Sequence, residues 1–212
     1  MPGASSELAR LARQLEERAG VPGPSSWLLE NAVLLPDVPS AGPPAAAARP
    51  RALDVACGSG RHALLLAAAG FEVLAIDRDA PAVEGLRHAA RTVGLGLRAE
   101  VCDLESGRGS MAGPRGALAP STYDLIVVVH YLHRPLFPAL VRALAQGGLL
   151  LYETFTVDQA AFGHPKNPAF LLQHGELPRL VAPLEVVRQR EGEFDGRRVA
   201  SVAARAPIRT PT

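Results

Sequence analysis

The fold is decided by a glycine loop between an apolar stretch and a helical pattern, Leu53-Asp54-Val55-Ala56-Cys57-Gly58-Ser59-Gly60-Arg61-His62-Ala63. Gly58 and Gly60 lack a Cβ atom, so the backbone can turn sharply there and approach a ligand closely. The helix that follows presents unpaired N–H groups at its start. Such a turn at the carboxyl end of a parallel strand is where open α/β sheets bind nucleotides. The stretch therefore predicts a nucleotide-binding loop.

Strand and helix patterns alternate on both sides of this loop. Strands are expected over 51–56, 71–76, 97–101, 123–129 and 149–155, with helices over 61–69, 81–91 and 136–145. Alternation of this kind predicts parallel βαβ units. Two further strand-like stretches, 184–190 and 197–205, flank Asp195-Gly196, a pair typical of hairpins. We predict a single α/β domain, a Rossmann-like doubly wound sheet of seven strands, mostly parallel, with a C-terminal antiparallel hairpin.

The chain is expected to divide into three parts. Residues 1–50 form an N-terminal helical extension and a Pro/Ala-rich linker, with an amphipathic helix over 5–19 and five prolines within 36–50. This extension either packs on the core or closes over a pocket as a lid. Residues 51–206 form the catalytic domain and residues 207–212 a tail.

The composition excludes several classes of protein. A formal net charge of +1 over 212 residues provides no overall attraction for nucleic acid. The two cysteines form no C-x-x-C motif, and the six histidines have no metal-ligand spacing. Charged residues interrupt the N-terminus and every long apolar run, so we expect no secretory signal, no membrane span and a cytoplasmic location.

Three acids give the loop its chemistry. Asp54 ends the strand before the loop and suits the ammonium group of a bound amino acid. Asp77 ends the next strand, placed to accept hydrogen bonds from ribose hydroxyls, while Asp79 can cap the following helix in its stead. Asp103 follows the third strand and suits an adenine amino group. Together they describe an adenosine with a cationic amino-acid tail, although Asp54 could instead bond loop backbone and Asp103 could simply start a loop.

Three segments carry a family resemblance: Asp54–Gly60 with Asp77, then Tyr123–Val129, then Gly147–Glu153. They resemble the signature segments of class I S-adenosylmethionine-dependent methyltransferases over roughly residues 51–155. The resemblance implies S-adenosylmethionine as the cofactor, with the expected contacts at Asp54, Ala56, Gly58, Gly60, Asp77, Arg78, Asp103 and Leu104.

A narrower resemblance concerns two short motifs. Cys57–His62 and Gly175-Glu176-Leu177 are similar to the tellurite-resistance type of methyltransferase, which acts on small molecules. Members of that type can carry a His-Arg pair near the final hairpin. Glu193-Phe194 and Arg197-Arg198 stand in that region here, so a chalcogen substrate is not carried over.

The acceptor pocket is expected at the carboxyl ends of the fourth and fifth strands. Methyl transfer from a sulfonium is an in-line displacement, for which good positioning alone can supply about 7–11 kcal/mol of the barrier. His130 or His133 is the candidate base, if one is used, and Arg134 the candidate contact for an anionic acceptor. Tyr131 or Phe155 could face the sulfonium. The competing interpretation is that the histidines bond only backbone and that Arg134 is solvated.

Two residues near the loop have an alternative use. Trp27 either lines the cofactor pocket as part of a lid or packs in the core. Cys57 lies inside the loop, but no neighbour in sequence would activate it as a nucleophile.

The function predicted from these patterns is methyl transfer to a small molecule. The N-terminal extension and segment 156–182 can wall a compact pocket, and the chain offers no basic surplus. Three alternatives remain open: an RNA or protein methyltransferase, a nicotinamide-dependent oxidoreductase using the same glycine loop, and a non-catalytic S-adenosylmethionine-binding protein. The oligomeric state is not indicated.

Overall fold

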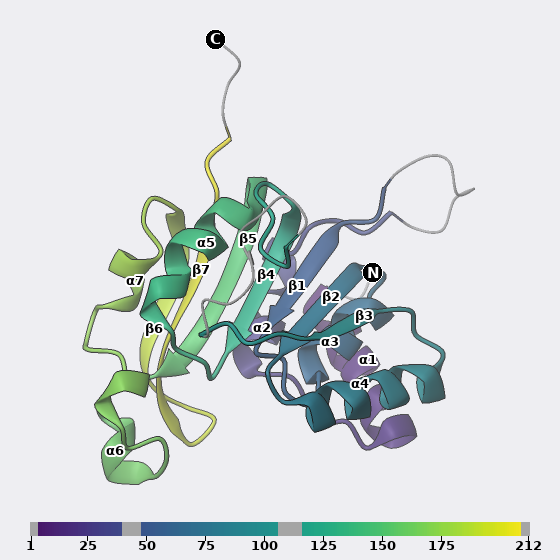
Figure 1. The fold of residues 1–212 in the computed structure, drawn as a ribbon, viewed down its shortest axis with the longest axis horizontal. Coiled ribbons are helices and arrows are strands. Elements are labelled where there is room, and N and C mark those ends of the chain that lie inside the picture. The colour runs from purple at the N-terminus through teal and green to yellow at the C-terminus, as the bar shows by residue number, and fades with distance from the viewer. Residues whose placement is uncertain (1–3, 40–47, 106–115, 209–212) are drawn as a thin grey trace.

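The computed structural model describes residues 4–39, 48–105 and 116–208. Its centre is a seven-stranded sheet with the order β3-β2-β1-β4-β5-β7-β6 (Figure 1). The first five strands are parallel and β7 runs antiparallel to both neighbours. The strands are β1 (Arg51–Val55), β2 (Glu72–Asp77), β3 (Arg98–Val101), β4 (Tyr123–Val129), β5 (Leu144–Phe155), β6 (Glu185–Phe194) and β7 (Arg197–Arg205). The predicted fold class is thus confirmed, including the final hairpin.

Helices cover both faces of the sheet. One face carries α1 (Ala4–Ala19), α2 (Ser26–Glu30), α3 (Arg61–Ala68) and α4 (Ala80–Val93). The other carries α5 (Phe137–Ala143) and α7 (Leu177–Leu180). Alternate residues of each strand point to opposite faces, so Val127 and Leu151 pack on the first group while Ile126 and Leu150 pack on the second. The short α6 (Gln159–Phe162) stands out at the lower left of Figure 1.

The structure corrects one predicted boundary. The helix expected over 136–145 ends at Ala143, and β5 begins at Leu144, five residues before the expected strand. Leu144 already has extended backbone and pairs with Tyr123, with a register shift before Leu125 pairs with Leu149. A Cβ atom at Gly148 would lie 2.8 Å from the carbonyl oxygen of Tyr123, so this glycine permits the close pairing of β5 with β4.

Several short elements were not predicted, because one turn of helix carries no periodic signal. They include α2, α6 and α7 and the 3-10 turns η1 (Ala32–Leu34), η2 (Arg134–Leu136) and η3 (Pro168–Phe170). Parts of the expected linker, of the loop 105–122 and of the tail lie outside the described residues. Among the described helices, none is long and apolar enough to cross a membrane.

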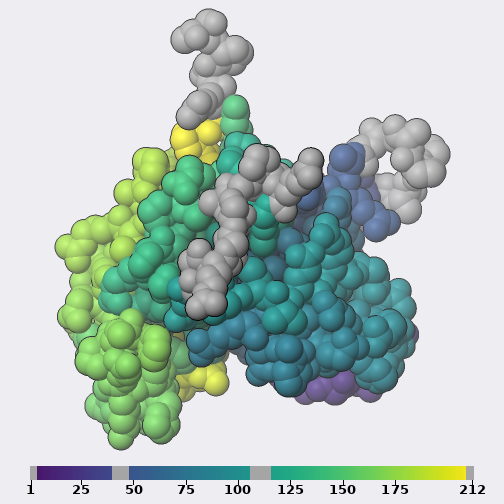
Figure 2. Space-filling model, in the orientation of Figure 1, coloured from purple at the N-terminus to yellow at the C-terminus, as the bar shows by residue number. Residues whose placement is uncertain are grey.

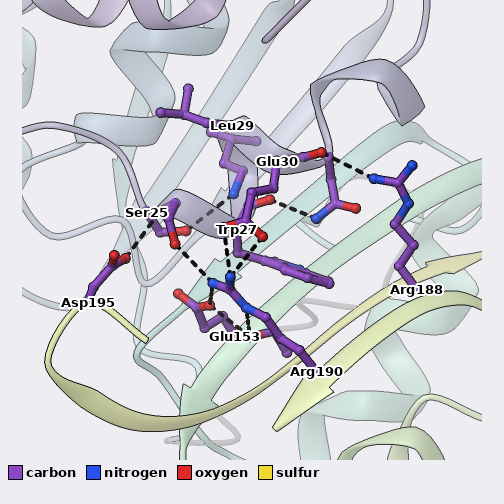
Figure 3. Close-up of polar contacts among 12 residues, drawn as sticks. Ser25, Trp27, Leu29, Glu30, Glu153, Arg188, Arg190 and Asp195 are labelled. Carbon is purple, nitrogen blue, oxygen red and sulfur yellow. Dashed lines mark hydrogen bonds and ion pairs between the residues drawn. The ribbon is translucent and has the colours of Figure 1, made fainter. Parts of the chain in front are cut away.

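The N-terminal segment is fastened to the sheet by a buried arginine (Figure 3). Arg190 on β6, whose side chain is only 11% exposed, donates to Glu153 on β5 at 2.9 Å. It also donates to both carboxylate oxygens of Glu30 at 2.8 Å and to Ser26 Oγ at 3.0 Å, both on α2. Its guanidinium lies over the ring of Trp27, 4.8 Å from the centroid. One side chain therefore ties two strands to the extension.

A second attachment runs through a buried histidine. Nε2 of His62 on α3 accepts a hydrogen bond from the backbone N–H of Ser25 at 3.1 Å. Burial, followed by the nearby charge of Arg61, lowers the pKa of His62 to about 3. The imidazole is therefore neutral in the folded protein and acts as an acceptor.

We expect Arg190→Met to destabilise the protein by about 3–5 kcal/mol, because it leaves the Glu153 carboxylate buried without its cation. The emission of Trp27, the only tryptophan, should also shift to longer wavelength as its packing on Arg190 is lost. Urea unfolding and fluorescence measure both effects. Arg188→Met is the matched control, since exposed Arg188 on the same strand makes one hydrogen bond to the Glu30 carbonyl. Equal stability and emission in the two variants would contradict this role.

A pH dependence follows from His62. Its pKa is about 3 when folded and 6.5 ordinarily, so the unfolded chain binds a proton that the folded chain refuses. The stability contributed by neutral His62 is complete above pH 6.5 and falls on acidification by up to about 1.4 kcal/mol per pH unit. His62→Gln keeps an acceptor for Ser25 but does not titrate.

The unfolding free energy of His62→Gln, measured from pH 7 to pH 5, should therefore fall less steeply than that of the wild type. His88→Gln, at an exposed position on α4, should keep the wild-type slope. A wild-type slope in His62→Gln would show that His62 takes up its proton normally in the folded state.

Candidate active site

The glycine loop leaves β1 at the point where the sheet order reverses between β1 and β4. Gly58 and Gly60 have φ angles of +53° and +78°, a left-handed conformation that favours glycine. A Cβ atom on Gly60 would overlap the side chain of Leu86 on α4. The two glycines thus serve different purposes, since a Cβ on Gly58 would meet no described atom within 4 Å. Gly58 leaves the backbone of the loop accessible, and Gly60 allows Leu86 of α4 to pack against the loop.

Two of the predicted acids support this loop. Asp77, at the end of β2, accepts from the Gly58 N–H at 2.7 Å and from the Asp79 N–H at 2.9 Å. Asp79 accepts from Ala82 N–H at the start of α4, which is the predicted cap. Each Asp77 oxygen keeps a lone pair, so the carboxylate can still accept from hydroxyl groups.

Asp54 is buried beneath the loop, with 1% of its surface exposed. One of its oxygens accepts from the Ala63 N–H at 2.9 Å, in the first turn of α3. Burial raises its pKa to about 7, although the Ala63 N–H and the charge of Arg61 oppose the rise. The backbone contact that was the alternative for Asp54 is therefore present, and its contact with an ammonium group stays a prediction.

A hollow of about 590 Å³, here called the main hollow, opens beside the loop. It brings together six of the predicted cofactor and acceptor residues, Ala56, Asp77, Arg78, Asp103, Leu104 and His130. Tyr131 and Phe155 also line it. In Figure 2 the lobe bearing α6 stands apart from the teal half of the molecule that carries β2 and β3. Asp54, Gly58 and Gly60 are not among the lining residues.

His130 is the acceptor-side candidate that the structure places at the centre. Its ring stacks on Phe155, with centroids 4.7 Å apart, and its backbone has a φ of +61°. Burial lowers its pKa to about 4, and the charges of Arg197 and Arg61 lower it further. Neutral His130 can accept a hydrogen bond but is a weak base.

The other two acceptor candidates lie elsewhere. His133 precedes η2 and lines neither the main hollow nor the smaller one described below. Arg134 forms a two-pronged ion pair with Glu176, at 2.6 and 2.9 Å, and donates to the carbonyls of Ala169 and Leu171. Its guanidinium fastens segment 169–176 to the sheet, so its position gives no support to an acceptor contact.

Trp27 also has a structural position. It is 4% exposed, and its indole N–H donates to the Val202 carbonyl at 3.2 Å. It lies between α2 and the sheet and lines neither the main hollow nor the smaller one described below. The alternative of core packing is what the structure shows, and the expected cofactor contact finds no support. Burial raises the pKa of the Cys57 thiol, which disfavours a thiolate nucleophile.

The far wall of the main hollow was not predicted residue by residue. His164, Pro165 and Phe170 come from the segment between β5 and α7. Cys102 and Glu105, which lie next to the predicted Asp103 and Leu104, line the hollow as well. Segment 156–182 was expected to form a wall, but no motif singles out these positions. Their assembly depends on tertiary contacts such as the Arg134–Glu176 ion pair.

A smaller hollow of about 300 Å³ is also lined by His130. Its floor comes from β5, β7 and α3, and its roof from the N-terminal segment. The lining residues are Pro24, Ser25, Ser26, Leu29, Arg61, His130, Glu153, Phe194, Asp195, Arg197 and Val199. We call it the arginine hollow.

Comparison with known proteins agrees with this geometry. Residues 52–148 match a family model described as a methyltransferase domain. No curated protein matches the chain. Among solved structures, TehB from Haemophilus influenzae is similar with a TM-score of 0.70 and 18% identity, covering 92% of this chain and 67% of that one.

Two further structures share the fold. One, described as "Conversion of a Disulfide Bond into a Thioacetal Group during Echinomycin Biosynthesis", has a TM-score of 0.63 and 20% identity, covering 91% and 85% of the two chains. An S-adenosylmethionine-dependent methyltransferase from Aquifex aeolicus has a TM-score of 0.58 and 16% identity, covering 95% and 97%.

The sheet order, the glycine loop and the matched segment 52–148 agree with the class I S-adenosylmethionine-dependent methyltransferases that the sequence resembles. The matched methyltransferase domain supports S-adenosylmethionine as the cofactor, and TehB shares the fold of this chain.

Proposed function

We propose that this protein transfers a methyl group from S-adenosylmethionine to a small molecule held in the main hollow. The observation that carries the proposal is the make-up of that hollow. Asp77 and Asp103, at the ends of β2 and β3, form its polar end, and Leu132 and Phe155, at the ends of β4 and β5, contribute apolar surface to its other end. A polar end for a nucleoside and an apolar end for a second ligand share one space of about 590 Å³, within the size of small-molecule sites.

The residues at the polar end fit an adenosine. Asp77 has free lone pairs for ribose hydroxyls, and the open face of Gly58 lets a ligand approach the backbone. Asp103 and Leu104 follow β3 on the same side of the hollow. Asp54 beneath the loop supplies a negative charge whose ionised form a nearby ammonium group would favour.

The cofactor, when bound, supplies a methyl group that is already activated on a sulfonium. The protein then has to position the acceptor and exclude water. Phe155, stacked on His130, gives the acceptor end a rigid aromatic wall. His130 can orient an acceptor through a hydrogen bond, but its lowered pKa makes it a poor proton acceptor. The site therefore suits an acceptor whose nucleophilic atom is already unprotonated.

Calorimetric titration tests the cofactor part of the proposal. S-adenosylhomocysteine should bind with micromolar affinity and NADH should not bind. Asp77→Ala should weaken S-adenosylhomocysteine by at least about tenfold, because charge-assisted hydrogen bonds to the ribose are lost. Glu72→Ala, at the exposed opposite end of β2, should bind as the wild type does. Thermal unfolding of unliganded Asp77→Ala checks that the loop still folds.

Binding of NADH without binding of S-adenosylhomocysteine would overturn the proposal in favour of an oxidoreductase. Undiminished binding by Asp77→Ala would remove Asp77 from the ribose site.

A further inference from the structure

The arginine hollow contains two cations for which the structure provides no ion pair. Arg61 at the start of α3 donates one hydrogen bond, to the Gly23 carbonyl at 3.1 Å. Arg197 is exposed at the start of β7. Among the described residues, no carboxylate lies within 4.0 Å of either guanidinium. Two arginines that face the same small space without a counter-ion are a typical anion-binding arrangement.

The acids that border this hollow have other partners. The Glu153 carboxylate pairs with Arg190 at 2.9 Å and accepts from Ser201 Oγ at 2.7 Å. Asp195 accepts from the Ser26 N–H at 3.4 Å. His130 is neutral, because burial and the two arginines lower its pKa. Burial lowers the pKa of Arg61, and the charge of Arg197 lowers it further, although Asp54, Glu153 and Asp195 partly oppose the fall. An anion placed between the two arginines would relieve the repulsion between them.

The position of the hollow indicates which anion this is. His130 lines both hollows, and Arg61 directly follows the glycine loop. Asp77 accepts from the Gly58 N–H, and Arg61 follows Gly58 by three residues, so the loop itself leads from the ribose end of the main hollow to the arginine hollow. The amino-acid end of S-adenosylmethionine suits that position, since it carries a carboxylate.

We propose that Arg61 and Arg197 bind the carboxylate of the cofactor's amino-acid end in the arginine hollow. This inference rests on the proposed function and assigns the two hollows different ligands. The arginine hollow holds the tail of the cofactor, which leaves the apolar end of the main hollow to the acceptor. The Arg61–Gly23 hydrogen bond joins the carboxylate site to the N-terminal segment that roofs it.

Two nucleosides that differ only in the carboxylate provide the test. S-adenosylhomocysteine has the complete amino-acid end, whereas 5′-deoxy-5′-(3-aminopropylthio)adenosine keeps the ammonium group and lacks the carboxylate. In calorimetry, the wild type should bind S-adenosylhomocysteine at least about tenfold more tightly, as expected for a hydrogen-bonded charge pair. Arg61→Gln and Arg197→Gln should each reduce this preference by weakening S-adenosylhomocysteine alone.

Arg91→Gln, on the exposed face of α4, is the control and should keep the preference. Arg197→Gln changes an exposed side chain, so its result does not depend on whether Arg61→Gln folds. Equal affinity of the wild type for the two nucleosides, or equal weakening of both in the arginine variants, would overturn the carboxylate assignment while leaving the proposed function intact. Failure of the wild type to bind either nucleoside would instead count against the proposed function.

Discussion

The rest of the site depends on the way two strand-end carboxylates hold the glycine loop. Asp77 reaches from β2 to the Gly58 N–H, and Asp54 reaches from β1 to the Ala63 N–H of α3. Backbone hydrogen bonds also hold the loop, since the Gly60 N–H donates to the Cys57 carbonyl and the Cys57 N–H donates to the Ile76 carbonyl of β2, and the two carboxylates add to them in setting its position. The two carboxylates also place negative charge beneath the loop. Burial of Asp54 raises its pKa to about 7, which shows that the protein accepts an electrostatic cost at this point.

A second constraint is the buried Arg190–Glu153 ion pair, which binds the N-terminal segment to the sheet. Replacing such a pair by apolar residues is often harmless to stability, whereas removing one partner is not. Here the ion pair serves to orient α2 relative to the sheet. Arg190 contacts α2, β5 and the rings of Trp27 and Phe194. These contacts fix the position of the N-terminal segment over the strands that line the arginine hollow. Glu153 is paired with Arg190 and forms no ion pair with Arg61.

The parts of the structure that depend on neighbouring residues in the chain can be predicted from the sequence. The order of strands and helices, the hairpin at Asp195-Gly196 and the Asp79 cap all follow from neighbouring residues. Ala56, Asp77, Asp103 and His130 could be placed because parallel strands end at one edge. Arg134 and Trp27 could not, because their roles are fixed by partners 42 and 175 positions away. Arg61 could be read as part of a motif, but its lack of an ion pair appears only in three dimensions.

One histidine, His130, lines both hollows, and the charges of the two hollows differ. Asp77, Asp103 and Glu105 line the main hollow together with Arg78, whereas Arg61 and Arg197 line the arginine hollow together with Asp195 and with Glu153, which is paired with Arg190. Burial lowers the pKa of His130, and the charges of Arg197 and Arg61 lower it further, so its ring stays neutral. A neutral ring stacked on Phe155 adds no repulsion to a sulfonium. The low pKa of His130 therefore comes first from burial and then from the two neighbouring arginines, and it fits a reaction in which the transferred group itself arrives with a positive charge.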